Sequence, residues 1–191
     1  MAAPILRDIK VRFPNMTVEL TVDLGANLSK ALFDHDLDLA LQSGPFNRST
    51  SFALPLSQSP HVWIATPDLA PAAPLTAADL TRHPILAHAR STASFRQLED
   101  HLRPLGGARL VPGSNLASCL QMAMYGLGIA CLPRALLTAA PAHGSLLELD
   151  YPWHPEGLQF HARHDLDPAA IHITEAALIA QRLSLPDDTI S

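Results

Sequence analysis

The chain is short of the positive charge that nucleic-acid binding requires. Only two of its 191 residues are lysines, Lys10 and Lys30, and its 13 basic residues are outnumbered by 18 acidic ones, for a formal net charge of −5. Basic residues form no run anywhere in the sequence. Because affinity for nucleic acid rests largely on neutralising phosphates, this chain by itself is not expected to bind DNA or RNA.

Cysteine is scarce too, and both cysteines, Cys119 and Cys131, lie in apolar sequence. A secreted disulfide framework has more cysteines, placed in loops, so we expect two reduced, buried thiols.

Residues 1–13 lack the apolar region of a signal peptide. The longest nearly uncharged run, residues 116–133, is at the short end for a membrane span and contains polar residues and two glycines. These absences predict a soluble, cytoplasmic protein.

What the sequence does contain is enough apolar residues, 48% against 16% charged, for a substantial core. Residues 17–24 (TVELTVDL) alternate polar and apolar as a half-covered strand does, Asn27 can cap the next helix, and residues 37–41 (LDLAL) are typical of a buried strand. Together they predict a β-α-β unit and an α/β fold. Further strands are expected at residues 61–65, 84–88, 145–149 and 158–163, and helices at 1–13, 76–81, 94–105, 114–125 and 168–183, the last capped by Asp167.

Two closely spaced glycines, Gly126 and Gly128, stand in the segment YGLGIACLPRALL, residues 125–137. A phosphate-binding P-loop has a strand before its glycines and a lysine with Ser or Thr after them. Here an apolar helical stripe comes first, no lysine follows, and residues 129–132 have the pattern of a strand. We therefore expect the glycines to end a helix and to let it pack closely on a short strand, not to bind phosphate.

This helix–GLGIACLP–strand unit resembles the GxGIAxLP segment in the effector-binding domain of LysR-type transcriptional regulators. Three other segments resemble the same family in the same order: FPNMTVELTV (residues 13–22), residues 28–41 ending in HDLDLAL, and PILAHARST (residues 84–92). In the second of these, His35 and Asp36 stand in place of the family's more usual glycine. The resemblance extends over nearly the whole chain.

The resemblance implies a type 2 periplasmic-binding-protein fold, in which two α/β lobes joined by two crossover strands hold a small molecule in a cleft between them. Lobe I would comprise residues 1–65 and 160–191, and lobe II residues 66–159. The family's winged helix-turn-helix is absent from this sequence, so we expect a fragment of a regulator that reaches DNA through that missing N-terminal domain. The strand that usually precedes the family's first helix is also absent, so the loop that in the family donates a Ser or Thr to the effector is not expected in this sequence.

Partners and effector follow from the same resemblance. In the family, the first helix and the segment after it pair antiparallel across a two-fold axis, so a homodimer, or a tetramer built from it, is expected. The effector implied is a small carboxylate or an aromatic acid. A solute-binding protein of a transporter would share the fold and is the alternative, which the lack of a signal peptide disfavours.

Helix N-termini offer free N–H groups and the positive end of a dipole, so they favour anions. In the implied fold several helix starts converge on the cleft, and polar residues near them are candidate effector contacts. Each could equally be a plain cap, and Ser94 with Gln97 makes a plausible capping box. Arginines, including Arg90, could add a bidentate contact to a carboxylate. The candidate effector-binding residues are Asn27, Ser43, Gly44, Ser91, Thr92, Ser114, Asn115 and Arg134.

Ten histidines invite a metal-site interpretation. His161 and His164, however, lie three apart in an expected strand and so point to opposite faces. His83 and His88 have no cysteine or carboxylate at ligand spacing nearby. Neither a G-x-S-x-G elbow nor another nucleophile signature is present. We therefore expect no metal, no cofactor and no catalysis, because an enzyme on this fold would need a cluster of titratable residues in the cleft.

Overall fold

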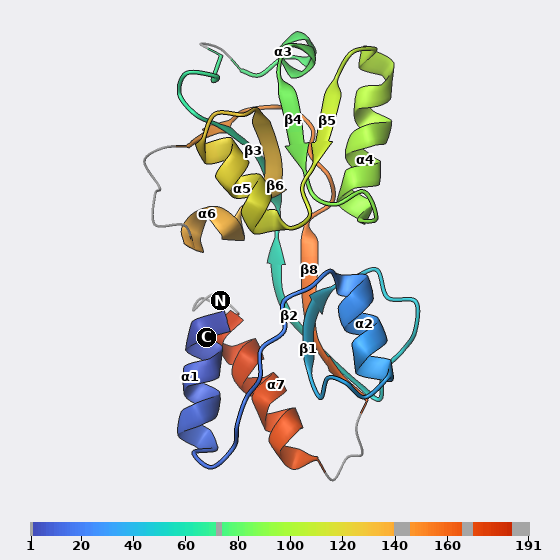
Figure 1. Cartoon of the computed structure of the whole chain (residues 1–191), viewed down its shortest axis with the longest axis vertical. Helices are drawn as coiled ribbons and strands as arrows, with labels where there is room; N and C mark the ends of the chain where they lie inside the picture. The colour runs from blue at the N-terminus through green and yellow to red at the C-terminus, as the bar shows by residue number, and fades with distance from the viewer. Residues whose placement is uncertain (1, 72–73, 140–145, 166–169, 185–191) are drawn as a thin grey trace, which may run out of the picture. The chain divides into compact units, whose positions relative to one another are not determined.

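The computed structural model describes residues 2–71, 74–139, 146–165 and 170–184, and the chain divides into two compact units. Unit 1 comprises Met1–Gln58 and Gln159–Ser191, and unit 2 comprises Ser59–Leu158. Each unit has its own sheet with helices packed on it (Figure 1). The α/β class predicted from the sequence is therefore confirmed.

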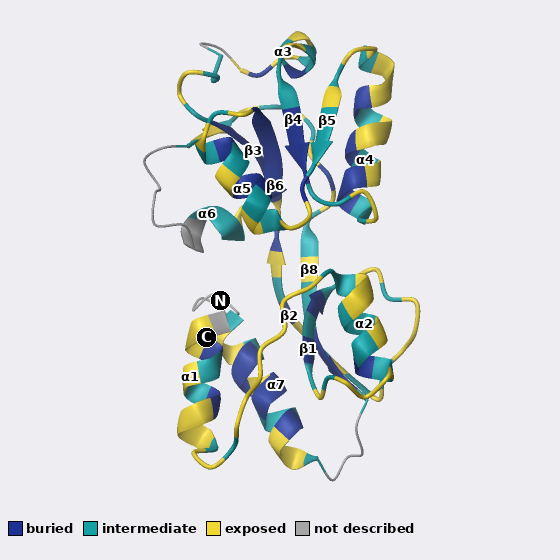
Figure 2. Ribbon diagram, in the orientation of Figure 1, coloured by how far each residue is buried: buried dark blue, intermediate teal, exposed yellow. Residues whose placement is uncertain are grey.

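Unit 1 is built on a three-stranded sheet in the order β1-β8-β2, formed by β1 (Ala40–Ser43), β8 (Leu158–His164) and β2 (Phe52–Ser59). β1 and β8 are antiparallel. α2 (Gly25–Phe33) lies against β1. α1 (Ala2–Arg12) and α7 (Ile171–Ser184) pack on each other, and Figure 2 shows the buried stripe of α7. Their shared core consists of Ile5, Ile9, Leu56, Ala162, Ala176, Ala177, Ile179 and Ala180.

Residues 17–24 do not form the strand that their alternation predicts. Val18, Leu20 and Val22 are instead 41%, 55% and 85% exposed. Alternation specifies only which side chains would share a face, whereas a strand also needs a neighbour with free N–H and C=O groups. In the described residues the unit 1 sheet consists of β1, β8 and β2 alone, so the expected β-α-β unit is wrong.

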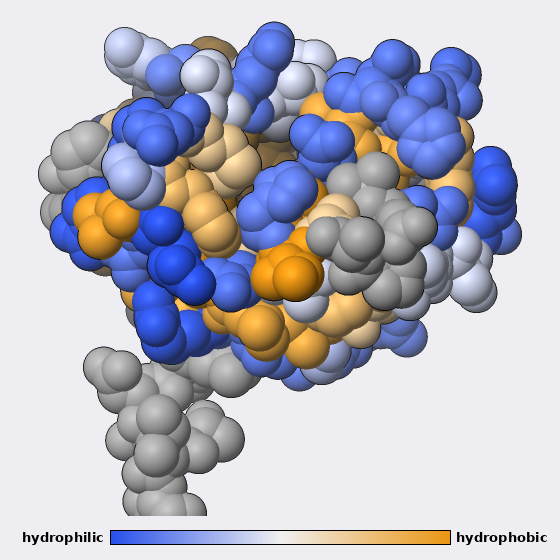
Figure 3. Space-filling view, turned by 90° about the horizontal axis from the view of Figure 1, so that it is seen from below, coloured by the Kyte–Doolittle hydropathy of each residue, from blue (hydrophilic) through white to orange (hydrophobic). Residues whose placement is uncertain are grey.

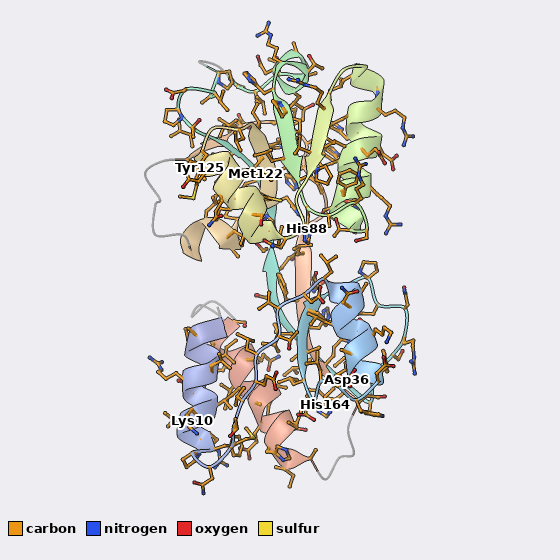
Figure 4. All side chains as sticks on the ribbon, in the orientation of Figure 1. Lys10, Asp36, His88, Met122, Tyr125 and His164 are labelled. Carbon is orange, nitrogen blue, oxygen red and sulfur yellow. The ribbon has the colours of Figure 1, made fainter. Side chains whose placement is uncertain are left out.

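The turn that leads from α1 into this segment is held by Lys10. Its ammonium group donates to the carbonyl oxygens of Pro14 (2.7 Å) and Met16 (3.1 Å). Figure 4 shows Lys10 towards the C-terminal end of α1, where a cation also suits the helix dipole. The helix ends before Pro14, as the sequence predicts.

Unit 2 is built on a five-stranded sheet in the order β5-β4-β6-β3-β7. β4 (Pro84–Ala87) runs parallel to both β5 (Arg109–Pro112) and β6 (Ile129–Pro133). β3 (His61–Ala65) runs antiparallel to β6 and to β7 (Leu147–Leu149). The helices of this unit are α3 (Ala77–Arg82), α4 (Ala93–Leu102), α5 (Leu116–Met124) and α6 (Ala135–Ala139), with a 3-10 turn, η1, at Arg103–Leu105.

The two faces of this sheet carry different helices. Ile85 and Ala87 of β4 lie in one buried cluster with Phe95, Leu98 and Leu102 of α4. The intervening Leu86 lies in a second cluster, together with Cys119, Leu120 and Ala123 of α5. Because successive strand residues point to opposite faces, α4 and α5 cover opposite sides of β4. All residues of β3 and β6 are buried, as expected of strands covered on both faces.

The paired glycines do what the sequence predicts. Gly126 follows α5 and has a φ of 68°. The N–H of Gly126 donates to Ala123 O and the N–H of Leu127 donates to Met122 O. This pair of hydrogen bonds is a Schellman motif. At Gly128 a Cβ atom would come within 2.3 Å of Pro84 O, so only glycine allows β6 to approach the start of β4. The prediction of a helix end and close packing is confirmed.

The remaining predicted helices and strands agree with the structure to within a few residues, but β2, β5 and the short helix α6 were missed. β2 contains Pro55, which argues against a central strand; it lies at the edge of its sheet, where a missing N–H is tolerated. β5 has only four residues and little alternation. The expected cap Asp167 lies outside the described residues.

β1 begins three residues later than expected because the turn before it takes up the intervening residues. His35 has a φ of 61°, and the N–H groups of Asp36 and Leu37 both bond back to Ala31 O, at 2.9 and 3.3 Å. These groups are therefore not available to a sheet. A left-handed residue with a Cβ is strained, whereas the glycine usual in the family is not.

Replacing His35 by glycine should stabilise the protein by about 1 kcal/mol relative to replacing it by alanine, because only glycine relieves the left-handed strain. Urea denaturation of His35→Gly and His35→Ala measures this difference. The alanine variant is the matched control, since both variants remove the same imidazole. Equal stability of the two would contradict the strain argument.

Candidate functional site

The carboxyl ends of β4 and β5 lie side by side at one edge of the unit 2 sheet, since Ala87 pairs with Pro112 in parallel register. The chain leaves β4 for α4 on one face and leaves β5 for α5 on the other. Connections that diverge to opposite faces at adjacent parallel strands create a crevice in which ligands commonly bind. We call this the β4–β5 edge; it includes residues 88–94 and 113–117.

α4 begins at this edge with Thr92 as its N-cap. The Thr92 Oγ1 accepts the N–H of Phe95 (3.3 Å) and donates to Ala89 O (2.8 Å). Ser94 lies inside the helix and is buried, so the capping box proposed for it is wrong. Ser91 precedes the cap and is exposed. The polar groups of Ser91 and Thr92 thus stand at the start of α4, as the sequence predicts.

α5 begins at the same edge with Asn115 as its N-cap, the Asn115 Oδ1 accepting the N–H of Ser118 (2.8 Å). The loop before it is fixed to the end of β4, because Gly113 N–H (2.8 Å) and Cys119 Sγ (3.1 Å) both donate to Ala87 O. A Cβ at Gly113 would lie 2.3 Å from that sulfur, so this loop is tightly packed. Ser114 is exposed beside Asn115.

The electrostatics of the β4–β5 edge favour an anion. Neither α4 nor α5 has an acidic residue in its first turn, so the positive ends of both dipoles are left without a carboxylate there. Arg90 and Arg96 flank the start of α4, and the Arg90 guanidinium lies over the Phe95 ring, 5.3 Å from its centroid. The sequence did not single out Arg96, although its position in the first turn of α4 was a usable signal.

Histidines at this edge of the sheet are kept neutral by burial. Figure 4 shows His88 just beyond β4, and desolvation lowers its pKa. Burial is the main cause that lowers the pKa of His61, at the start of β3, to about 4. The hydrogen bond to Glu156 O raises this pKa, whereas the nearby His154 and His88 lower it. Sequence reasoning considered His88 only as a metal ligand, because it could not show that the residue ends a strand beside two helix starts.

Arg134 follows β6 but is already engaged. The Arg134 guanidinium forms an ion pair with Glu148 of β7, and the backbone N–H of Arg134 donates to Pro60 O (2.8 Å). Both side chains are about half exposed, so this ion pair contributes little to stability. A role for Arg134 in binding an effector would require that pair to open.

The remaining candidates belong to unit 1. Asn27 is not a cap, because α2 starts at Gly25, and its Nδ2 donates to Asp23 Oδ1 (2.9 Å). Hydrogen bonds from Asn27 and from Leu24 N–H lower the pKa of Asp23, whose carboxylate thus supplies negative charge beside the start of α2. Ser43 and Gly44 lie at the end of β1, near Gly25. This helix start is therefore less suited to an anion than those of α4 and α5.

Metal and nucleophile chemistry find no support in the described residues. They contain no group of three His, Cys, Asp or Glu side chains placed to hold a metal ion. His161 lies against Phe46, while His164 stacks on Phe52 on the other face of β8. Cys119 and Cys131 are free and buried, and burial raises the pKa of both thiols. Their predicted state is confirmed.

Solved structures with a similar fold include regulatory domains. The reduced regulatory domain of OxyR2 from Vibrio vulnificus gives a TM-score of 0.72 at 16% identity, covering 94% of this chain and 87% of that chain. Reduced OxyR from N. meningitidis gives 0.71 at 17%, covering 95% and 88%. The regulatory domain of CcmR from Synechocystis PCC6803, in complex with 2-PG, gives 0.73 at 17%, covering 94% and 89%. These likenesses confirm the type 2 periplasmic-binding-protein fold class.

A family model described as the LysR substrate binding domain matches residues 1–176. The chain belongs to this family, which confirms the resemblance and favours the ligand-sensing domain of a LysR-type regulator over a solute-binding protein of a transporter. No curated protein is similar enough in sequence to count as a match. None of the helices in the described residues is long and apolar enough to cross a membrane.

Acid should destabilise the protein through His61. The unfolded chain takes up a proton at this residue near pH 6.5 and the folded chain only near pH 4, so stability is full above pH 6.5 and falls as the pH drops towards 4. Between pH 7.5 and pH 5 this residue alone should remove about 2 kcal/mol.

Urea denaturation at the two pH values, compared between wild type and His61→Gln, measures this contribution. Glutamine keeps a donor for Glu156 O but does not titrate, so the acid-induced loss should be smaller in the variant. His172→Gln, at an exposed position in α7, is the control and should keep the wild-type loss. An unchanged loss in His61→Gln would refute the assignment.

Proposed function

We propose that this chain senses a small anionic effector at the β4–β5 edge and performs no chemistry on it. The observation that carries the proposal is the meeting of two helix N-termini, both capped by neutral side chains and neither neutralised by an acidic residue in its first turn. Hydroxyl groups of Ser91 and Ser114 and the amide NH2 of Asn115 can donate hydrogen bonds, Thr92 holds the start of α4 in place, and Arg90 and Arg96 supply positive charge.

The class of effector follows from this chemistry. Backbone N–H groups at helix starts bind carboxylate, phosphate and sulfate oxygens alike, so a small carboxylate, an aromatic acid or a phosphorylated acid fits. The CcmR regulatory domain is described in complex with 2-PG, and one structure of an OxyR2 regulatory domain as sulfate-bound, which supports an anion. In a regulator of this family, the bound effector changes the state of this domain, and the DNA-binding domain responds.

A thermal-shift screen tests the anion preference with inorganic phosphate, 2-phosphoglycolate, small carboxylates and aromatic acids, each beside its neutral amide or ester. A ligand at about a hundred times its Kd should add roughly 2.7 kcal/mol of stability, about 5–10 °C at this chain length. Neutral analogues should give no shift, and no ligand should be consumed.

Variants then locate the site. Ser91→Ala and Ser114→Ala change exposed residues, so they should barely alter the basal melting temperature but should reduce the ligand shift. Thr76→Ala is the control: it removes the cap of α3, which precedes β4, and should lower the basal melting temperature while leaving the ligand shift intact. A hit that is turned over, or one equally strong with the neutral analogue, would overturn the proposal.

We also propose that the chain forms a homodimer through α1 and residues 17–24. Val11, at 78% exposure, and the outward Val18, Leu20 and Val22 give this part of unit 1 apolar side chains that a second copy would cover. Apolar side chains also reach the surface among hydrophilic ones in the view from below (Figure 3). Residues 17–24 pair with no strand in the part of the chain that the structure describes, and the family pairs this region across a two-fold axis.

Sedimentation equilibrium measures this association. Val22→Glu should shift the dimer to monomer at micromolar concentration without unfolding it, since the residue is 85% exposed. Leu127→Glu, at an exposed position in unit 2, should leave the dimer unchanged. A wild-type chain that stays monomeric at high concentration, or equal effects of both variants, would speak against this interface.

A further inference from the structure

The segment of residues 150–157 has neither helix nor strand, yet side chains hold it closely to unit 2. It joins β7 to β8, the strand at whose start the chain passes from unit 2 into unit 1. Pro155 is among the most deeply buried residues of the protein. Most of the segment is exposed or half-buried, so apart from the buried Pro155 its position depends on the hydrogen bonds and ring contacts made to it, which therefore influence how the chain enters β8.

Two of these groups come from α4. Gln97 Oε1 accepts the N–H of Glu156 (2.9 Å). One turn further along, His101 shares a hydrogen bond with the Tyr151 hydroxyl (3.0 Å), and its ring stacks on Trp153 with 3.8 Å between centroids and an interplanar angle of 2°. We call these contacts the α4 clasp.

The other groups come from β3. Trp63 Nε1 donates to Trp153 O (2.7 Å), and its ring meets that of Tyr151 edge-on at 5.4 Å. His61 Nδ1 donates to Glu156 O (2.9 Å). The peptide at Glu156 is thus held on its N–H side by α4 and on its C=O side by β3.

Gln97 and His101 lie on the same stripe of α4 as Ala93, because residues four apart share a helix face. That stripe begins at the capped end of the helix, in the β4–β5 edge. One rigid element therefore carries the proposed anion site at one end and the clasp along its length. The contacts of Gln97 and His101 therefore connect α4 to residues 150–157 directly, without passing through the sheet.

We propose that the α4 clasp is the relay by which effector binding at the start of α4 is passed to the segment that leads into β8. This inference rests on the proposed function for its ligand, but not for its mechanical part. Gln97 and His101 are positioning residues: they do not touch the effector, and they transmit its presence. Both tryptophans of the chain, Trp63 and Trp153, lie in this cluster, so their fluorescence reports on it.

The mechanical part is tested without ligand, by hydrogen exchange of residues 150–158. Gln97→Ala should speed exchange of the Glu156 amide roughly three- to tenfold, as expected for loss of one hydrogen bond. Thr92→Ala, which loosens the start of α4, should also speed it if α4 relays. Asn115→Ala, which loosens the start of α5 on the opposite face, is the matched control and should leave it unchanged. Equal exchange in Thr92→Ala and wild type overturns the relay.

The ligand part uses inorganic phosphate as the probe, with thermal shift and tryptophan fluorescence recorded on the same samples. In wild type both signals should saturate at the same phosphate concentration. Gln97→Ala combined with His101→Ala should keep the thermal shift and lose most of the fluorescence response. A full fluorescence response in that variant overturns the relay. Absence of any thermal shift in wild type would instead count against phosphate as a ligand, and the exchange experiment would still decide the relay.

Discussion

Burial of β4 between two parallel neighbours is the constraint on which the rest of unit 2 depends. Ile85 and Ala87 must be covered on one face and Leu86 on the other, so α4 and α5 are driven to opposite sides of the sheet. Because both helices follow parallel strands, they start at the same edge. Packing that satisfies the core therefore also brings two positive helix ends together, and no separate binding element is needed to create the anion-favouring edge.

The starts of α2, α4 and α5 differ in charge, and this difference points to function. At α2 the carboxylate of Asp23 already supplies negative charge, held by Asn27 and the Leu24 N–H. At α4 and α5 neutral Thr92 and Asn115 satisfy one N–H each and leave the dipoles uncompensated. An N-cap that is polar but uncharged stabilises its helix while keeping the site open to a ligand that brings the negative charge itself.

Local chemistry made part of this structure predictable. Three features could be predicted from a residue and its near neighbours in the sequence. They are the glycine turn after α5, the end of α1 before Pro14, and the polar residues Thr92 and Asn115 at the starts of their helices. The strand predicted at residues 17–24 was wrong because a strand needs a hydrogen-bonding partner, which periodicity along the sequence does not reveal. Asn27 failed as a cap because α2 starts earlier than its polar residue suggested, and the grouping at the β4–β5 edge required knowing which strands are neighbours.

The uneven distribution of lysine between the units has a practical consequence. Lys10 and Lys30 both lie in unit 1, as does the amino terminus of the chain, so unit 2 carries no primary amine. Amine-directed coupling to a biosensor surface must attach the protein through unit 1 alone. The helix starts and arginines of the β4–β5 edge would stay chemically unmodified, which makes immobilised protein suitable for measuring small-anion binding directly.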